Sequence, residues 1–127
     1  MSKQERITVN GTGIHWMIYS CKIALSTLNS IRQQSSPQEK KDIKEFNRIY
    51  NGIQNVNAYL EQREKSESKQ LSFLPKEIHC LKYSSKLTLS ALERQMQEKS
   101  LSRKDSNNIA DVFVHIRDLD QFLSTID

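Results

Sequence analysis

Apolar residues recur every three or four positions in four separate stretches of the chain. In the first stretch they are Ile14, Met17, Cys21, Ala24, Leu28 and Ile31. This spacing places side chains on one face of a helix, which then needs a packing partner. The same alternation in the other stretches predicts helices over residues 14–34, 37–63, 75–98 and 106–126.

Local signals support some of these boundaries. Ser36, Pro37 and Glu39 form a helix-start pattern, with a capping hydroxyl, a proline at the first helical position and a carboxylate that reaches back. Thr12 is the expected cap of the first helix. Gly52, inside the second helix, predicts a close approach of another helix, because glycine in a helix interior otherwise costs about 1 kcal/mol.

The third helix has a less regular pattern than the others. Its main apolar stripe is interrupted by Ser85 and Thr88. The polar stretch 64–70 before it reads as a solvated linker or a frayed helix end. Four amphipathic helices with short connections pack as a bundle. We therefore predict a single all-α domain over residues 1–127, an antiparallel four-helix bundle with a short irregular N-terminal tail.

The composition favours a helical protein of the reducing cytoplasm. The 127 residues include only three glycines and two prolines, too few for many short strands and tight turns. No apolar run is long enough to span a membrane, and no signal peptide is apparent. Cys21 and Cys80 lie far apart in helical contexts, so we expect two free thiols and a cytoplasmic location.

The sequence contains no catalytic, cofactor or metal-binding motif that we can recognise. Neighbours on a helix point about 100° apart, so His79 and Cys80 cannot form a dyad. Asp111, His115 and Asp118 share one helix face, which is more typical of a solvated polar surface than of a metal site. We expect a protein that is not an enzyme and that needs no cofactor.

Positive charge is clustered on two helices. The net charge of +4 divides into +3 over residues 1–34, +1 over 35–70, +2 over 71–100 and −2 over 101–127. The second helix carries one basic stripe of Lys41, Lys44 and Arg48. The third helix carries another, of His79, Lys82 and Lys86. Clustered cations are typical of phosphate contacts, so binding of RNA or DNA is the alternative function.

Surplus apolar residues favour a protein partner instead. Trp16 and Ile23 lie off the main stripe of the first helix, and Tyr83 and Leu87 lie on a second apolar face of the third. A helix in a minimal bundle needs one buried stripe, and Trp and Tyr are enriched at binding hot spots. The other interpretation is a wide stripe on a central helix, with Trp16 covered by the N-terminal tail.

In size, charge and helix count the chain resembles the accessory four-helix proteins of diversity-generating retroelements and small bacteriocin-immunity bundles. The Arg–His signature of HEPN ribonuclease bundles is not present around His79 or His115. We therefore expect a non-enzymatic regulatory or inhibitory adaptor, of a kind that phages and mobile elements encode. It would bind a protein partner or form a homo-oligomer through Trp16, Ile23, Tyr83 and Leu87.

Overall fold

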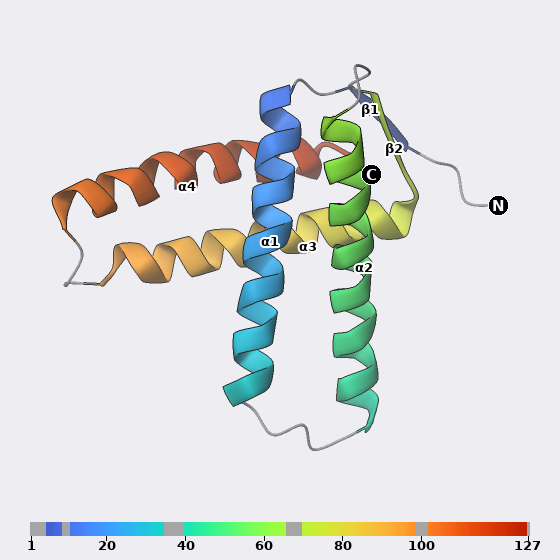
Figure 1. Cartoon of the computed structure of the whole chain (residues 1–127), viewed down its shortest axis with the longest axis horizontal. Coiled ribbons are helices and arrows are strands. Elements are labelled where there is room, and N and C mark those ends of the chain that lie inside the picture. The colour runs from blue at the N-terminus through green and yellow to red at the C-terminus, as the bar shows by residue number, and fades with distance from the viewer. Residues whose placement is uncertain (1–4, 9–10, 35–39, 66–69, 99–101, 127) are drawn as a thin grey trace.

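The computed structural model describes residues 5–8, 11–34, 40–65, 70–98 and 102–126. Four helices form two antiparallel hairpins, and the second hairpin runs across the first (Figure 1). The helices are α1 (Gly11–Gln34), α2 (Lys40–Glu64), α3 (Pro75–Met96) and α4 (Arg103–Ser124). The predicted all-α fold of four helices that pack against each other is confirmed, and the tertiary structure adds the steep crossing of the two hairpins.

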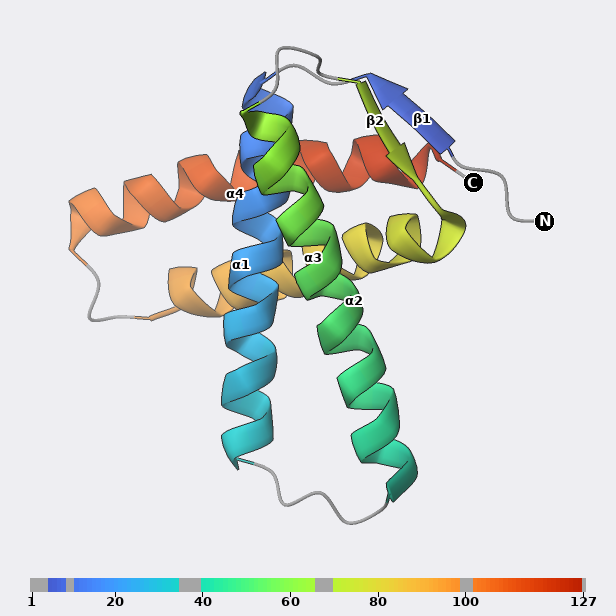
Figure 2. The same cartoon turned by 45° about the vertical axis from the view of Figure 1, so that its right-hand side comes forward.

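Two short strands correct the prediction of an irregular N-terminal tail. Strand β1 (Glu5–Thr8) pairs antiparallel with β2 (Gln70–Phe73), so that Ile7 lies opposite Leu71 (Figure 2). Leu71 and Phe73 are fully buried, and the backbone N–H of Ser72 donates to the Tyr59 hydroxyl at 3.0 Å. The pairing joins segments more than sixty residues apart, so local pattern in neither segment predicted it.

Some helix boundaries also differ from the predicted ones. Helix α1 begins at Gly11, so Thr12 lies inside it and does not cap it. Helix α4 begins earlier than predicted because the hydroxyl of Ser102 accepts a hydrogen bond from the backbone of Asp105 at 3.1 Å. The predicted cap at Ser36 and Pro37 lies outside the described residues.

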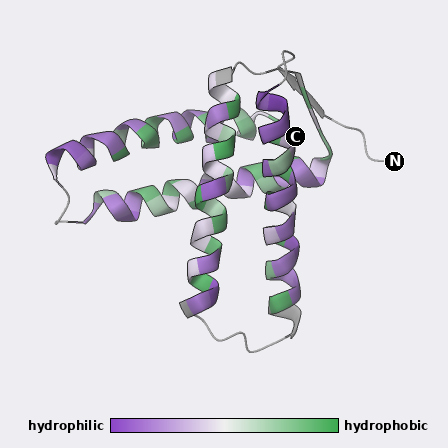
Figure 3. Ribbon diagram, in the orientation of Figure 1, coloured by the Kyte–Doolittle hydropathy of each residue, from purple (hydrophilic) through white to green (hydrophobic). Residues whose placement is uncertain are grey.

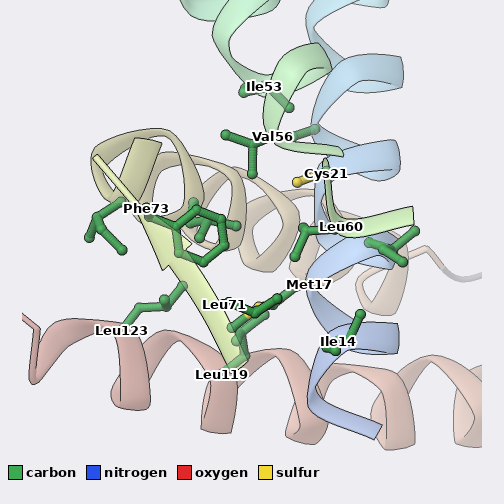
Figure 4. Packing of buried hydrophobic residues seen from close by; sticks show 14 of the residues in the cluster. Ile14, Met17, Cys21, Ile53, Val56, Leu60, Leu71, Phe73, Leu119 and Leu123 are labelled. Atoms are coloured by element: carbon green, nitrogen blue, oxygen red, sulfur yellow. The ribbon is translucent and has the colours of Figure 1, made fainter. Parts of the chain in front are cut away.

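One hydrophobic core joins the two hairpins. Met17 and Cys21 from α1, Val56 and Leu60 from α2, and Leu119 from α4 meet there (Figure 4). Strand β2 closes one side of the core, where the ring of Phe73 meets Tyr59 edge-on at 5.4 Å. Green apolar and purple polar segments alternate along each of the four helices, as expected for helices with one buried face (Figure 3).

The residues that interrupt the stripe of α3 lie at its contacts with other helices. Ser84, Ser85 and Thr88 are all fully buried. Thr88 donates to the carbonyl of Ser20 on α1 at 2.9 Å, and Ser85 donates to Asp120 on α4 at 2.8 Å. These small hydroxyl side chains let α3 approach both neighbours closely while their polar atoms stay bonded.

Candidate functional site

A groove of about 660 Å³ lies between the middle of α2 and the first half of α3. We call it the α2–α3 groove. Helix α2 lines it with Arg48, Ile49, Asn51, Gly52 and Asn55, and the start of α3 with Leu74, Lys76, Glu77, His79, Cys80 and Tyr83.

Gly52 explains why the two helices touch and then separate. A Cβ atom added at Gly52 would lie 2.8 Å from the sulfur of Cys80, which is closer than carbon and sulfur can pack. The close approach predicted at this glycine is confirmed. Helices that cross steeply touch near one point and diverge from it, and the groove occupies the space beside that contact.

The wall of the groove is apolar. Ile49, Cys80 and Tyr83 are half-buried and pack against the hydrophobic core, so they are held in place from behind. Leu74 is also half-buried, at the position just before α3. A rigid apolar wall of this kind is suited to an apolar side chain of a ligand, since little conformational entropy is lost on binding.

The rim of the groove carries more positive than negative groups. Arg48, Lys76 and His79 are exposed, and the side chain of Arg48 is 63% accessible. Glu77 is the one carboxylate of the lining, and its Oε1 accepts the backbone N–H of Leu74 at 2.6 Å. This carboxylate therefore caps the start of α3, where Pro75 occupies the first helical position.

Arg48 is partly engaged within its own helix. Its guanidinium forms an ion pair and hydrogen bonds with Glu45, three residues earlier. Hydrogen bonding of the guanidinium to this carboxylate raises the pKa of Arg48. Both side chains are more than half exposed, so the pair is weak and exchangeable, and a carboxylate of a ligand can replace Glu45.

The two thiols differ in their surroundings. Burial raises the pKa of Cys21 to about 12. Burial also raises the pKa of Cys80, although the nearby Arg48 acts in the opposite direction. Both side chains are therefore protonated at neutral pH, and a protonated thiol is a poor nucleophile.

The apolar residues predicted to bind a partner do not lie on one common surface of the structure. Tyr83 lines the groove, and Leu87, one turn later, is half-buried against the core. Trp16 faces α4 instead, where its ring stacks on His115 at 4.4 Å. Ile23 is half-buried on α1 and does not line the groove. A partner-binding role for Trp16 and Ile23 stays a prediction.

The two predicted basic stripes also differ. On α3, Lys82 donates to the carbonyl of Ile126, and Lys86 lies 3.4 Å from the carboxylate of Asp120, so both lysines contact α4 or the residues after it. On α2, Lys44 is exposed and Arg48 lies at the groove. The side chain of Lys41 lies outside the described part of the structure.

Sequence reasoning did not identify Lys76 and Asn55 as residues that line the groove, because each is an ordinary polar residue of a helix. The nearest signal was Gly52, which marked the close contact but not the opening beside it. Within the described residues, no three His, Cys, Asp or Glu side chains form a group that could hold a metal ion. None of the described helices is long and apolar enough to cross a membrane.

The chain matches no protein-family model, no curated protein and no solved structure. Its function therefore has to be argued from its own residues.

Proposed function

We propose that this protein is a non-enzymatic helical interaction protein, which binds an acidic segment of a protein partner in the α2–α3 groove. The observation that carries the proposal is the combination of an apolar wall with a cationic rim in one groove. An amphipathic segment fits both features, with an apolar side chain against Tyr83 and Ile49 and a carboxylate at Arg48 or Lys76.

The contacts of the basic residues favour a protein segment over nucleic acid. Lys82 and Lys86 interact with α4 or the residues after it, which lowers their availability for phosphates. The groove also offers apolar surface, which a phosphate backbone does not need. Binding of RNA or DNA by the basic stripes remains the alternative prediction, and the experiment below includes it as an outcome.

The test is selection of short peptides from a randomised library on the purified protein. We expect enrichment of Asp and Glu beside Leu, Phe or Trp. Arg48→Glu and Lys76→Glu should each weaken the selected peptides roughly tenfold, because each replaces an attraction by a repulsion. Lys44→Glu is the matched control, since this lysine is exposed on the same helix but does not line the groove.

Three results would contradict the proposal. The first is enrichment of basic peptides, and the second is equal loss of binding in the Lys44→Glu control. The third is salt-sensitive binding of an oligonucleotide that Lys44→Glu weakens, combined with normal binding of the selected peptides by the Arg48→Glu and Lys76→Glu proteins. That last pattern would assign phosphate binding to the α2 stripe instead.

A further inference from the structure

The outer face of α4 combines exposed apolar and acidic residues. Val114 and Phe122 are 43% and 38% exposed, so their side chains add apolar surface to this face. Asp118 lies between them at four-residue spacing, and Asp111 lies one turn before Val114; both carboxylates are exposed. We call Asp111, Val114, Asp118 and Phe122 the α4 face.

The opposite side of the same helix explains why this face points outward. Ile116, Leu119 and Leu123 are buried. On one flank, Asp120 accepts hydrogen bonds from Ser85 and Lys86 of α3. These contacts hold the helix in one orientation, so the α4 face is not free to rotate toward the core.

The neighbours of the α4 face extend it. His115 lies between Asp111 and Asp118 on the helix surface, and Trp16 of α1 stacks on its ring. On the other side, the side chain of Arg117 is 52% exposed and lies 3.9 Å from Asp118, so that this cation is already partly paired. The resulting surface has an acidic and apolar character with a tryptophan at its border.

This character is complementary to the α2–α3 groove, which presents an apolar wall and the cations Arg48 and Lys76. The two surfaces of one molecule cannot meet. Helix α4 lies on one side of α3, whereas the part of α2 that lines the groove lies on the other side (Figures 1 and 2). Only a second copy can bring the α4 face to the groove.

We infer that copies of this chain associate head-to-tail, with the α4 face of one copy docked in the α2–α3 groove of the next. The inference rests on the proposed function, since it names one occupant of the same groove. An interface made of two different surfaces leaves each complex with one free groove and one free α4 face. The assembly therefore grows with concentration into rings or chains and does not stop at a symmetric dimer.

The first measurement is sedimentation velocity of the full chain over a range of protein and salt concentrations. We expect the average mass to rise with protein concentration and to fall with added salt. Phe122→Lys and Arg48→Glu should each give a monomer, because each removes one of the two surfaces. The matched controls are Ile43→Lys, which changes a similarly exposed apolar residue outside both surfaces, and Lys44→Glu.

The decisive experiment mixes the two monomeric variants. The Arg48→Glu copy keeps an intact α4 face, and the Phe122→Lys copy keeps an intact groove, so together they should form a one-to-one dimer that grows no further. A symmetric interface would not be restored by mixing. All substitutions are at exposed positions, and circular dichroism should show unchanged helix content.

The inference is overturned by a wild-type monomer at all concentrations, by a symmetric dimer, or by equal disruption in the Ile43→Lys control. Its failure is distinguishable from failure of the proposed function. Phe122→Lys should still bind the selected acidic peptides with unchanged affinity, whereas Arg48→Glu should both bind these peptides more weakly and lose self-association. A monomeric wild type that binds those peptides would refute the head-to-tail contact and leave the proposed function standing.

Discussion

Helix α3 crosses both helices of the first hairpin, but the two crossings differ. Where α3 meets α1, Ser20, Ser84 and Thr88 are buried and their hydroxyls are hydrogen-bonded. Where α3 meets α2, Gly52 provides one close contact with Cys80, and a groove opens beside it. The first crossing is closed, and the second is partly open.

The difference shows how small residues determine the shape of a helical surface. At the crossing with α1, short hydroxyl side chains from consecutive turns of α3 are fully buried between the two helices. A single glycine allows contact at one point, beyond which longer side chains hold the helices apart. The closed crossing contributes to stability, and the open one leaves apolar surface for a ligand.

The largest expected effect is the loss of stability caused by a bulky substitution at the closed crossing. Ser84→Leu should lower the free energy of unfolding by roughly 3 kcal/mol, because the added volume has no space at a fully buried position. Urea denaturation measures the change. Ser90→Leu is the control, since Ser90 lies exposed on the same helix and should change stability by no more than about 0.5 kcal/mol. Equal effects at the two positions would contradict the closed crossing.

The second prediction uses the buried thiol at the closed crossing. The pKa of Cys21 is raised from 9.0 to about 12, so the folded state keeps its proton where the unfolded state loses it. The free energy of unfolding therefore keeps its full value below pH 9 and falls as the pH rises from 9 toward 12. At about pH 10.5, the loss should reach about 2 kcal/mol relative to neutral pH.

Urea denaturation at the two pH values, under reducing conditions, measures this loss. Cys21→Ala should lose correspondingly less stability on the alkaline side, since it has no thiol to ionise. If wild type and Cys21→Ala lose the same amount, Cys21 is not the group responsible.

The third prediction compares the effect of Gly52→Ala on stability in the presence and in the absence of the Cys80 sulfur. In the wild-type background, Gly52→Ala gains helix propensity but places its Cβ against the sulfur of Cys80. In a Cys80→Ala background, the same substitution should stabilise the protein by about 1 kcal/mol. A double-mutant cycle should therefore give a coupling energy of about 1 kcal/mol or more. Additive effects would show that α2 and α3 do not touch there.

The smallest expected effect concerns the thiol in the groove. Arg48 opposes the rise in the pKa of Cys80 that burial causes, so Arg48→Glu should slow alkylation of Cys80 by roughly twofold. Mass spectrometry after treatment with iodoacetamide measures the rate. Cys21, which is fully buried, should stay unmodified in the native protein. An equal slowing by Lys44→Glu would show that Arg48 has no special position beside the thiol.

Part of the candidate site was visible in the sequence. Tyr83 stood out as an apolar residue off the main stripe, and Gly52 as a contact point, because each departs from the helical pattern around it. Lys76 and Asn55 did not, since nothing in a helical sequence tells which polar residue borders a groove. Trp16 stood out equally well, but its ring meets His115, almost a hundred residues away in the chain.

The sequence by itself determined the four helices and their apolar faces, because helical periodicity depends on residues within a few positions of one another. It also located the close contact at Gly52. Only the tertiary structure decided that the hairpins cross, that β1 pairs with β2, and that buried hydroxyls on α3 bond to α1 and α4. These features depend on which distant side chains meet, and a packed interior selects one such arrangement through volume and hydrogen bonding that no local pattern records.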